Sequence, residues 1–158
     1  MESPETFPPE AYEPEETQDR FAPDAAWVWS AGERLTWLGG MVLALSTLMG
    51  WYVNSSGDLT VAVIGWHTGA LAKVVLLIGL AVVALHLLHA AGIALPATVP
   101  ESLVVIVLGS LATILVLIRV ISIPDDFQPA NRGIGIWISL IAAVAVIVAG
   151  LLRASEEL

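Results

Sequence analysis

Residues 133–152 read GIGIWISLIAAVAVIVAGLL and contain no ionisable side chain, while Arg132 and Arg153 stand at the two ends. A helix of this length reaches about 30 Å, the thickness of the hydrocarbon core of a bilayer. The two flanking arginines can place their guanidinium groups among lipid phosphates. This stretch therefore predicts a membrane-spanning helix.

Three further apolar stretches repeat the pattern, at residues 35–53, 69–91 and 102–121. Of the 158 residues, 57% are hydrophobic and only 13% are charged, whereas a soluble domain has about 25% charged residues. The segments that connect these spans are short, so neighbouring spans must run antiparallel. We therefore predict an all-α fold in which residues 30–153 form a transmembrane four-helix bundle with up-down-up-down topology.

The segment before the bundle, residues 1–29, has a different composition. Residues 1–24 hold five prolines, eight acidic residues and one arginine, and the whole chain has a net charge of −9. Such a segment buries too little apolar surface to offset its chain entropy, so we predict a disordered acidic tail. It is either a solvated spacer or a docking segment for a basic protein partner. Residues 154–158 form a polar stub.

Local signals indicate where the spans begin and end. Ser30 and Glu33 form a capping box that predicts the start of the first helix, and Thr98 and Glu101 form a second one before residues 102–121. Aromatic residues favour the membrane interface, so we expect an interfacial position for a set of four tryptophans and one tyrosine: Trp27, Trp29, Trp37, Trp51 and Tyr52. Residues 59–64 are β-prone and predict a short strand or an interfacial wedge.

The basic residues do not decide the orientation. Four spans place both termini on one side, and three basic residues fall on each side: Arg20, Arg34 and Arg153 with the termini, and Lys73, Arg119 and Arg132 opposite. The loops opposite the termini are the longer ones, and larger loops more often face outward. We therefore expect a multi-pass protein of the cell membrane with both termini in the cytoplasm.

Small residues at spacing four predict where helices touch. In lipid, helices associate through close backbone approach at small side chains, and the last and first spans offer such residues: Gly135, Ser139, Ala143, Ser46 and Gly50. We interpret these faces as a packing seam inside the bundle. A homodimer seam of the GxxxG kind is the alternative.

Charged residues gather near the interface opposite the termini. Lys73 and Arg119 lie close to span ends, so both can extend to the headgroups, and Arg132, Asp125 and Asp126 belong to the same side. These five residues form a predicted mixed-charge cap. It either anchors the bundle and pairs its loops or binds a lipid headgroup or a small anionic solute.

His86 and His89 share one face of the second span, the spacing at which two imidazoles can meet one metal ion. A structural zinc site needs four ligands, and spans one, three and four contain no histidine that could hold a haem from a second helix. A metal or haem role, a pH-responsive role and an interfacial polar role all stay open. We predict no cofactor.

The sequence does not contain a recognisable catalytic constellation, because the hydroxyl residues of the spans have no base at the same membrane level. The scattered basic residues disfavour nucleic acid as a partner. The aliphatic centres of the spans disfavour a channel. Membrane lipids are the expected surroundings, and we predict a protein without enzymatic activity.

Short motifs at the span ends resemble those of a loosely defined set of small, uncharacterised four-span bacterial membrane proteins, of a kind frequent in actinobacteria. The likeness covers about residues 30–153 and rests on five motifs: Gly32-Glu33-Arg34-Leu35, Trp51-Tyr52, Trp66, Leu117-Ile118-Arg119-Val120 with Pro124, and Arg132-Gly133-Ile134-Gly135-Ile136-Trp137. The resemblance implies a fold and a membrane location. Together with the residues it favours an accessory or scaffold protein of the bacterial membrane, and binding or transport of a lipid or anionic solute at the cap is the alternative.

Overall fold

The computed structural model describes residues 25–56, 58–93 and 99–157. Most of the predicted acidic tail, residues 1–24, lies outside the described residues, as does Thr98 of the second capping box. Residues 25–29, which we assigned to the tail, are helical.

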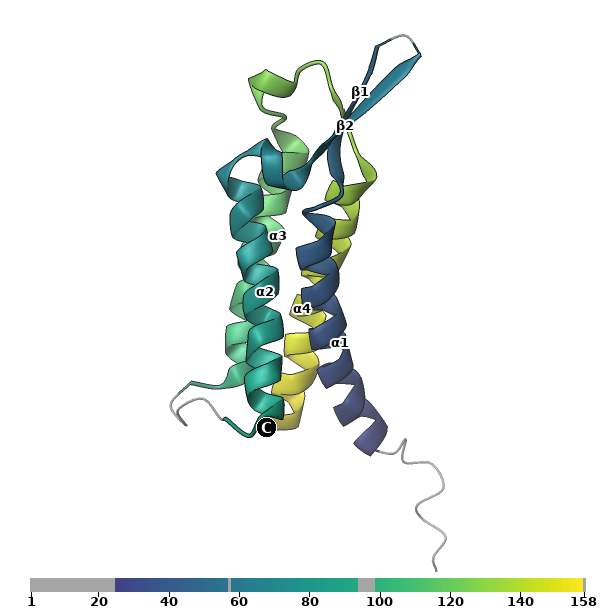
Figure 1. Ribbon diagram of the computed structural model, residues 1–158. Helices are drawn as coiled ribbons and strands as arrows, with labels where there is room; N and C mark the ends of the chain where they lie inside the picture. The colour runs from purple at the N-terminus through teal and green to yellow at the C-terminus, as the bar shows by residue number, and fades with distance from the viewer. Residues whose placement is uncertain (1–24, 57, 94–98, 158) are drawn as a thin grey trace, which may run out of the picture.

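Within the described residues, four helices lie side by side: α1 (Ala25–Ser46), α2 (Ala70–Ala90), α3 (Glu101–Ile121) and α4 (Ile134–Glu157) (Figure 1). Both α1 and α3 pack against α2 and against α4, so the helices form a closed ring of neighbours. Consecutive helices run in opposite directions. The prediction of a mainly helical protein is confirmed, but a small sheet that the all-α class leaves out is also present.

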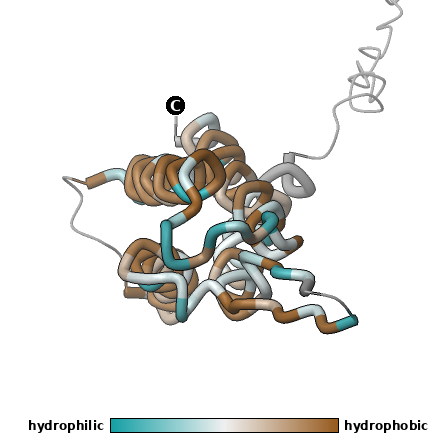
Figure 2. Tube along the Cα trace, turned by 90° about the horizontal axis from the view of Figure 1, so that it is seen from above, coloured by the Kyte–Doolittle hydropathy of each residue, from teal (hydrophilic) through white to brown (hydrophobic). Residues whose placement is uncertain are grey.

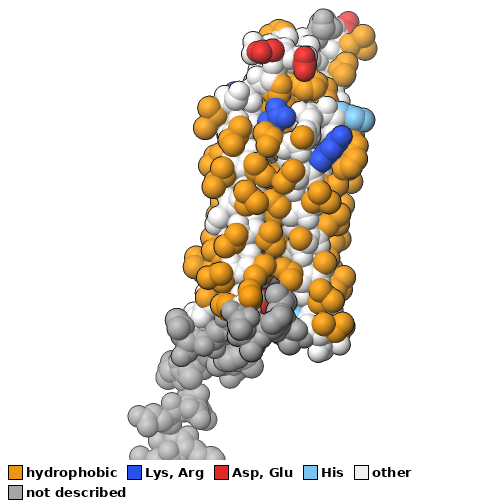
Figure 3. Space-filling view, turned by 90° about the vertical axis from the view of Figure 1, so that its left-hand side faces the viewer, with side chains coloured by type: hydrophobic (Ala, Val, Ile, Leu, Met, Phe, Trp, Pro, Cys, Tyr) orange, Lys and Arg blue, Asp and Glu red, His pale blue; other side chains and the backbone are white. Residues whose placement is uncertain are grey.

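Three of the helices in the described part of the chain are long and apolar enough to cross a membrane: α2, α3 and the stretch Ile134–Ser155 of α4. They coincide with the apolar stretches predicted at 69–91, 102–121 and 133–152. Their outward positions carry large aliphatic side chains, among them Leu77, which is 63% exposed, and Ile141, which is 71% exposed. Hydrophobic side chains consequently cover the helical surface (Figure 3).

The first helix differs from the prediction at both ends. α1 begins at Ala25, so Ser30 lies inside the helix and not at its N-cap. It ends at Ser46, so the prediction of one helical span over residues 35–53 is wrong in its last part. The strand β1 (Gly50–Ser56) begins there and pairs antiparallel with β2 (Leu59–Ile64). β-branched and aromatic residues favour this pairing over a longer helix.

The strands form a sheet of order β2-β1-β3 in the described residues, where β3 is only Asn131–Arg132. Trp51 and Tyr52 lie in β1 and are fully buried, so the prediction of an aromatic belt at this point is wrong. The indole Nε1 of Trp51 donates to the carbonyl oxygen of Ser46 at 3.0 Å, which replaces the water that an interfacial tryptophan would bind. The predicted strand at residues 59–64 is confirmed as β2.

Glycines permit the closest contacts between helices. A Cβ atom on Gly79 of α2 would lie 2.7 Å from the backbone nitrogen of Ala44 in α1, and one on Gly150 of α4 would lie 3.0 Å from that of Ile106 in α3. Seen along the bundle, the helices are hydrophobic and the polar residues lie mainly in the connections that cross its end (Figure 2). The interior therefore consists of small and aliphatic side chains in direct contact.

Candidate functional site

The predicted packing seam lies between α1 and α4. The Oγ atoms of Ser46 and Ser139 are 2.7 Å apart, and Ser139 also donates to the carbonyl oxygen of Gly135 at 2.9 Å. A Cβ on Gly135 would lie 2.9 Å from the carbonyl oxygen of Gly50, and Ala143 is fully buried. The structure thus brings these residues together inside one chain, and a homodimer through the same faces would have to displace this contact.

Ionisable side chains from all four helices meet at the end of the bundle where α1 begins. We call this set the polar layer: Glu33 of α1, His86 and His89 of α2, Glu101 of α3 and Arg153 of α4. Glu101 forms an ion pair with Arg153, whose Nη2 lies 2.9 Å from Oε1 of the carboxylate, and the other carboxylate oxygen lies 2.9 Å from Nδ1 of His89. Glu33 is 3.9 Å from Nδ1 of His86. Glu101 therefore links three helices.

Helix polarity explains why Glu101 and Arg153 meet. α3 begins at Glu101, with Pro100 at its N-cap, and Arg153 lies near the C-terminal end of the antiparallel helix α4. A carboxylate is stabilised at a helix N-terminus, so the dipole of α3 favours the charged form of Glu101 at this position. Both side chains are close to nine-tenths buried, with 12% and 11% exposure. The pair is a buried ion pair between helix ends.

Sequence reasoning missed this ion pair. It assigned Arg153 to lipid phosphates and Glu101 to the capping box before residues 102–121. The available signal was the antiparallel order of the spans, which places the start of each helix beside the end of the next.

The two histidines do not converge on one metal site. Nδ1 of His86 and Nδ1 of His89 lie near different carboxylates, those of Glu33 and Glu101. In the described part of the chain, no group of three or more His, Cys, Asp or Glu residues has metal-binding geometry.

At the opposite end of the bundle, the cap arginines bind backbone carbonyls. Nη2 of Arg119 donates to the carbonyl oxygen of Thr68 at 2.9 Å, and Nε of Arg132 donates to that of Val120. The hydroxyl of Tyr52 donates to the carbonyl oxygen of Arg119 at 3.1 Å. Side chains from β1 and β3 therefore satisfy carbonyls that α3 leaves free at its C-terminus.

The other residues of the mixed-charge cap lie at the same end of the bundle, but among the residues described none of them forms an ion pair or hydrogen bond with the two arginines. Lys73 places Nζ 5.2 Å from the centroid of the Trp66 ring, a cation–π contact. Asp125 and Asp126 are exposed, and Asp125 accepts from Nε2 of Gln128 at 3.2 Å. Acidic side chains are outermost, with Lys and Arg side chains nearer to the helices (Figure 3). No ion pair joins the cap cations to the cap acids within the described residues.

Searches against protein-family models, curated proteins and solved structures found no match. The resemblance to small four-span bacterial membrane proteins stays a prediction.

The ion pair of the polar layer gives the first prediction. Glu101→Gln leaves the buried guanidinium of Arg153 without a counter-charge, so we expect the free energy of unfolding to fall by about 3 kcal/mol. The double variant Glu101→Leu/Arg153→Leu should lose less, because it leaves no unpaired charge. Reversible denaturation in detergent micelles measures all three proteins.

Glu33→Gln is the matched control. Glu33 is half-exposed, at 49%, and is farther from its partner, so its loss should change stability by less than about 1 kcal/mol. Equal effects of Glu101→Gln and Glu33→Gln would contradict a buried ion pair.

Proposed function

We propose that the chain is a four-span integral membrane protein that serves as a non-catalytic accessory or scaffold protein. The observation that carries the membrane location is the distribution of aliphatic side chains. Leu77 of α2, Ile114 of α3 and Ile141 of α4 are each more than half exposed. In water such a surface would lead to aggregation, whereas lipid tails solvate it.

The fourth crossing is proposed from α1 together with the segment that follows it. After Glu33 and Arg34, the uncharged part of α1 is residues 35–46, which is about 18 Å of helix. The turn and the base of β1 then continue in the same direction (Figure 1). Their backbone groups have protein partners: Trp66 N donates to the Thr47 carbonyl at 3.0 Å, and Gly65 N donates to that of Met49 at 3.1 Å. Non-helical backbone is tolerated at membrane depth when protein satisfies it in this way.

The packing of the bundle interior favours the proposal of a scaffold protein and disfavours a channel. The axis is filled by fully buried aliphatic side chains from three helices: Val75, Val82, Val105, Val116 and Val146. Such packing offers no polar path for an ion or solute. The cap cations support anchoring, because Arg119, Arg132 and Lys73 already have partners in the protein.

The acidic tail is the proposed contact surface for a partner. Residues 1–24 carry eight of the fifteen acidic residues of the chain, and the helix that follows them begins at the polar-layer end. A basic segment of a membrane-associated protein has the complementary charge. We propose that this end faces the cytoplasm.

The number of crossings is testable because the chain has no cysteine. We expect single cysteines at Ser3 and Ser155 to react with an impermeant maleimide from the same side of the membrane. Cysteines at Asp58 and Asp125 should react from the other side. Labelling of Ser3→Cys and Ser155→Cys from opposite sides would contradict four spans and indicate three.

Replacement of the tail acids tests the scaffold role. In the full chain, exchanging the eight acidic residues of 1–24 for Gln and Asn should abolish a stoichiometric protein partner that co-purifies with the native chain in mild detergent. Quantitative mass spectrometry of the purified complexes measures this. The matched control exchanges Asp58, Asp125 and Asp126 at the opposite end and should keep the partner. Equal partner content in the native and tail-neutral proteins would contradict the role of the tail.

A further inference from the structure

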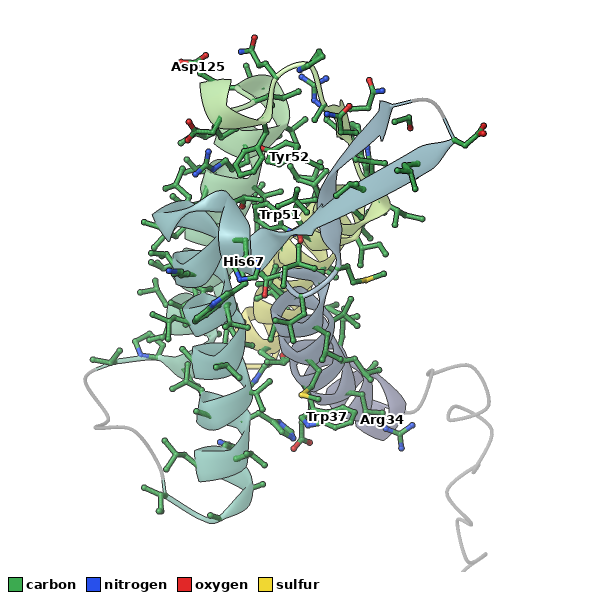
Figure 4. The ribbon with its side chains drawn as sticks, turned by 45° about the horizontal axis from the view of Figure 1, so that its top comes forward. Arg34, Trp37, Trp51, Tyr52, His67 and Asp125 are labelled. Atoms are coloured by element: carbon green, nitrogen blue, oxygen red, sulfur yellow. The ribbon has the colours of Figure 1, made fainter. Side chains whose placement is uncertain are left out.

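A groove opens between the β1–β2 hairpin and the segment of residues 124–130. Its volume is about 410 Å³, within the range of small-molecule sites. Nine residues line it: Tyr52, Asn54, Leu59, Val61, Val63, Asp126, Phe127, Gln128 and Ala130. It lies beyond the apolar helices, at the end where the hairpin projects (Figure 4).

One wall of the groove is aliphatic. Leu59, Val61 and Val63 alternate along β2 and so share one face of the hairpin. Leu59 is 73% exposed and Val61 is 60% exposed, which is high for aliphatic side chains outside the apolar helices. The opposite wall contributes Phe127, whose ring stacks on Tyr52 with centroids 5.6 Å apart. The groove can therefore hold the apolar body of a ligand between an aliphatic and an aromatic wall.

The one ionisable carboxylate that lines the groove belongs to Asp126. Asp126 is exposed, and no described residue forms an ion pair with it. Asn54 and Gln128 add amide oxygens, and the amide nitrogen of Gln128 already donates to Asp125. None of the nine residues that line the groove is basic. A ligand with a cationic, hydrogen-donating head matches this lining.

We propose that the groove binds a small amphipathic amine, with its aliphatic or aromatic body against Val61, Val63 and Phe127 and its protonated amino group at Asp126. An ammonium gains from the carboxylate and from the faces of aromatic rings. An anionic head is disfavoured because it would face the unpaired charge of Asp126.

The test uses fluorine NMR on the full chain in lipid nanodiscs. The sequence has two tyrosines, Tyr12 and Tyr52, so a Tyr12→Phe protein labelled with 3-fluorotyrosine carries one reporter beneath Phe127. Titration with hexylammonium should shift the Tyr52 signal saturably. Hexanoate and hexanol, which have the same alkyl chain, should give no saturable shift. A saturable shift with either of them, or none with hexylammonium, would overturn the proposal.

Two matched pairs of variants test whether hexylammonium contacts Asp126 and Val61. Asp126→Asn should weaken hexylammonium binding five- to tenfold, while Asp125→Asn, a neighbour outside the groove lining, should leave it unchanged. Val61→Asn should weaken binding, while Thr60→Asn, on the opposite face of the same strand, should not. All four positions are exposed, so the fold should tolerate the changes. Equal affinities within either pair would also overturn the proposal.

Discussion

Backbone hydrogen bonding is the constraint on which the structure depends at the end of α1. A helix that stops at Ser46, inside an apolar surrounding, would leave its last carbonyl groups without partners. Here the turn that follows α1 supplies donors for the helix end, because the amides of residues 47–49 donate to the carbonyls of residues 44–46. The amides of Trp66 and Gly65, just after β2, then donate to the carbonyls of Thr47 and Met49 in that turn. Gly133, just before α4, donates to the carbonyl of Trp51 at 2.6 Å. The residues after β2 and before α4 thus supply donors for carbonyls of the segment that follows α1.

Polar side chains form the contacts at both ends of the bundle. At one end the indole of Trp51, the hydroxyl of Tyr52 and the guanidinium of Arg132 bind carbonyls released by α1 and α3. At the other end Glu101, where α3 begins, and Arg153, in the last part of α4, form an ion pair. Between the ends, glycine, serine and alanine allow close contacts, and buried aliphatic side chains such as Val82 and Val146 fill the space that is left. Polar chemistry is therefore concentrated at the ends of the helices, as expected of a chain surrounded by lipid.

The sequence predicts those parts of the structure that depend on local apolar length. The predicted spans at 69–91 and 102–121 lie within one residue of α2 and α3 at each end, because uninterrupted hydrophobic runs need no tertiary information. The break at Ser46 could not be predicted, since residues 50–53 are as apolar as a helix end and only pairing with β2 and β3 distinguishes them. The Ser46–Ser139 contact follows from small-residue spacing. The Glu101–Arg153 pair depends on which helix ends meet, and that is a tertiary property.

Hydrogen exchange at the end of α1 tests the central claim most directly. The measurement follows the backbone amides of Gly65, Trp66 and Gly133 in the full chain reconstituted in lipid nanodiscs. The account predicts protection comparable to that of amides in the middle of α2, because each of the three amides donates to a backbone carbonyl of the segment after α1. Exchange as fast as in an unstructured peptide would contradict it and would show that the segment after Ser46 does not complete a crossing.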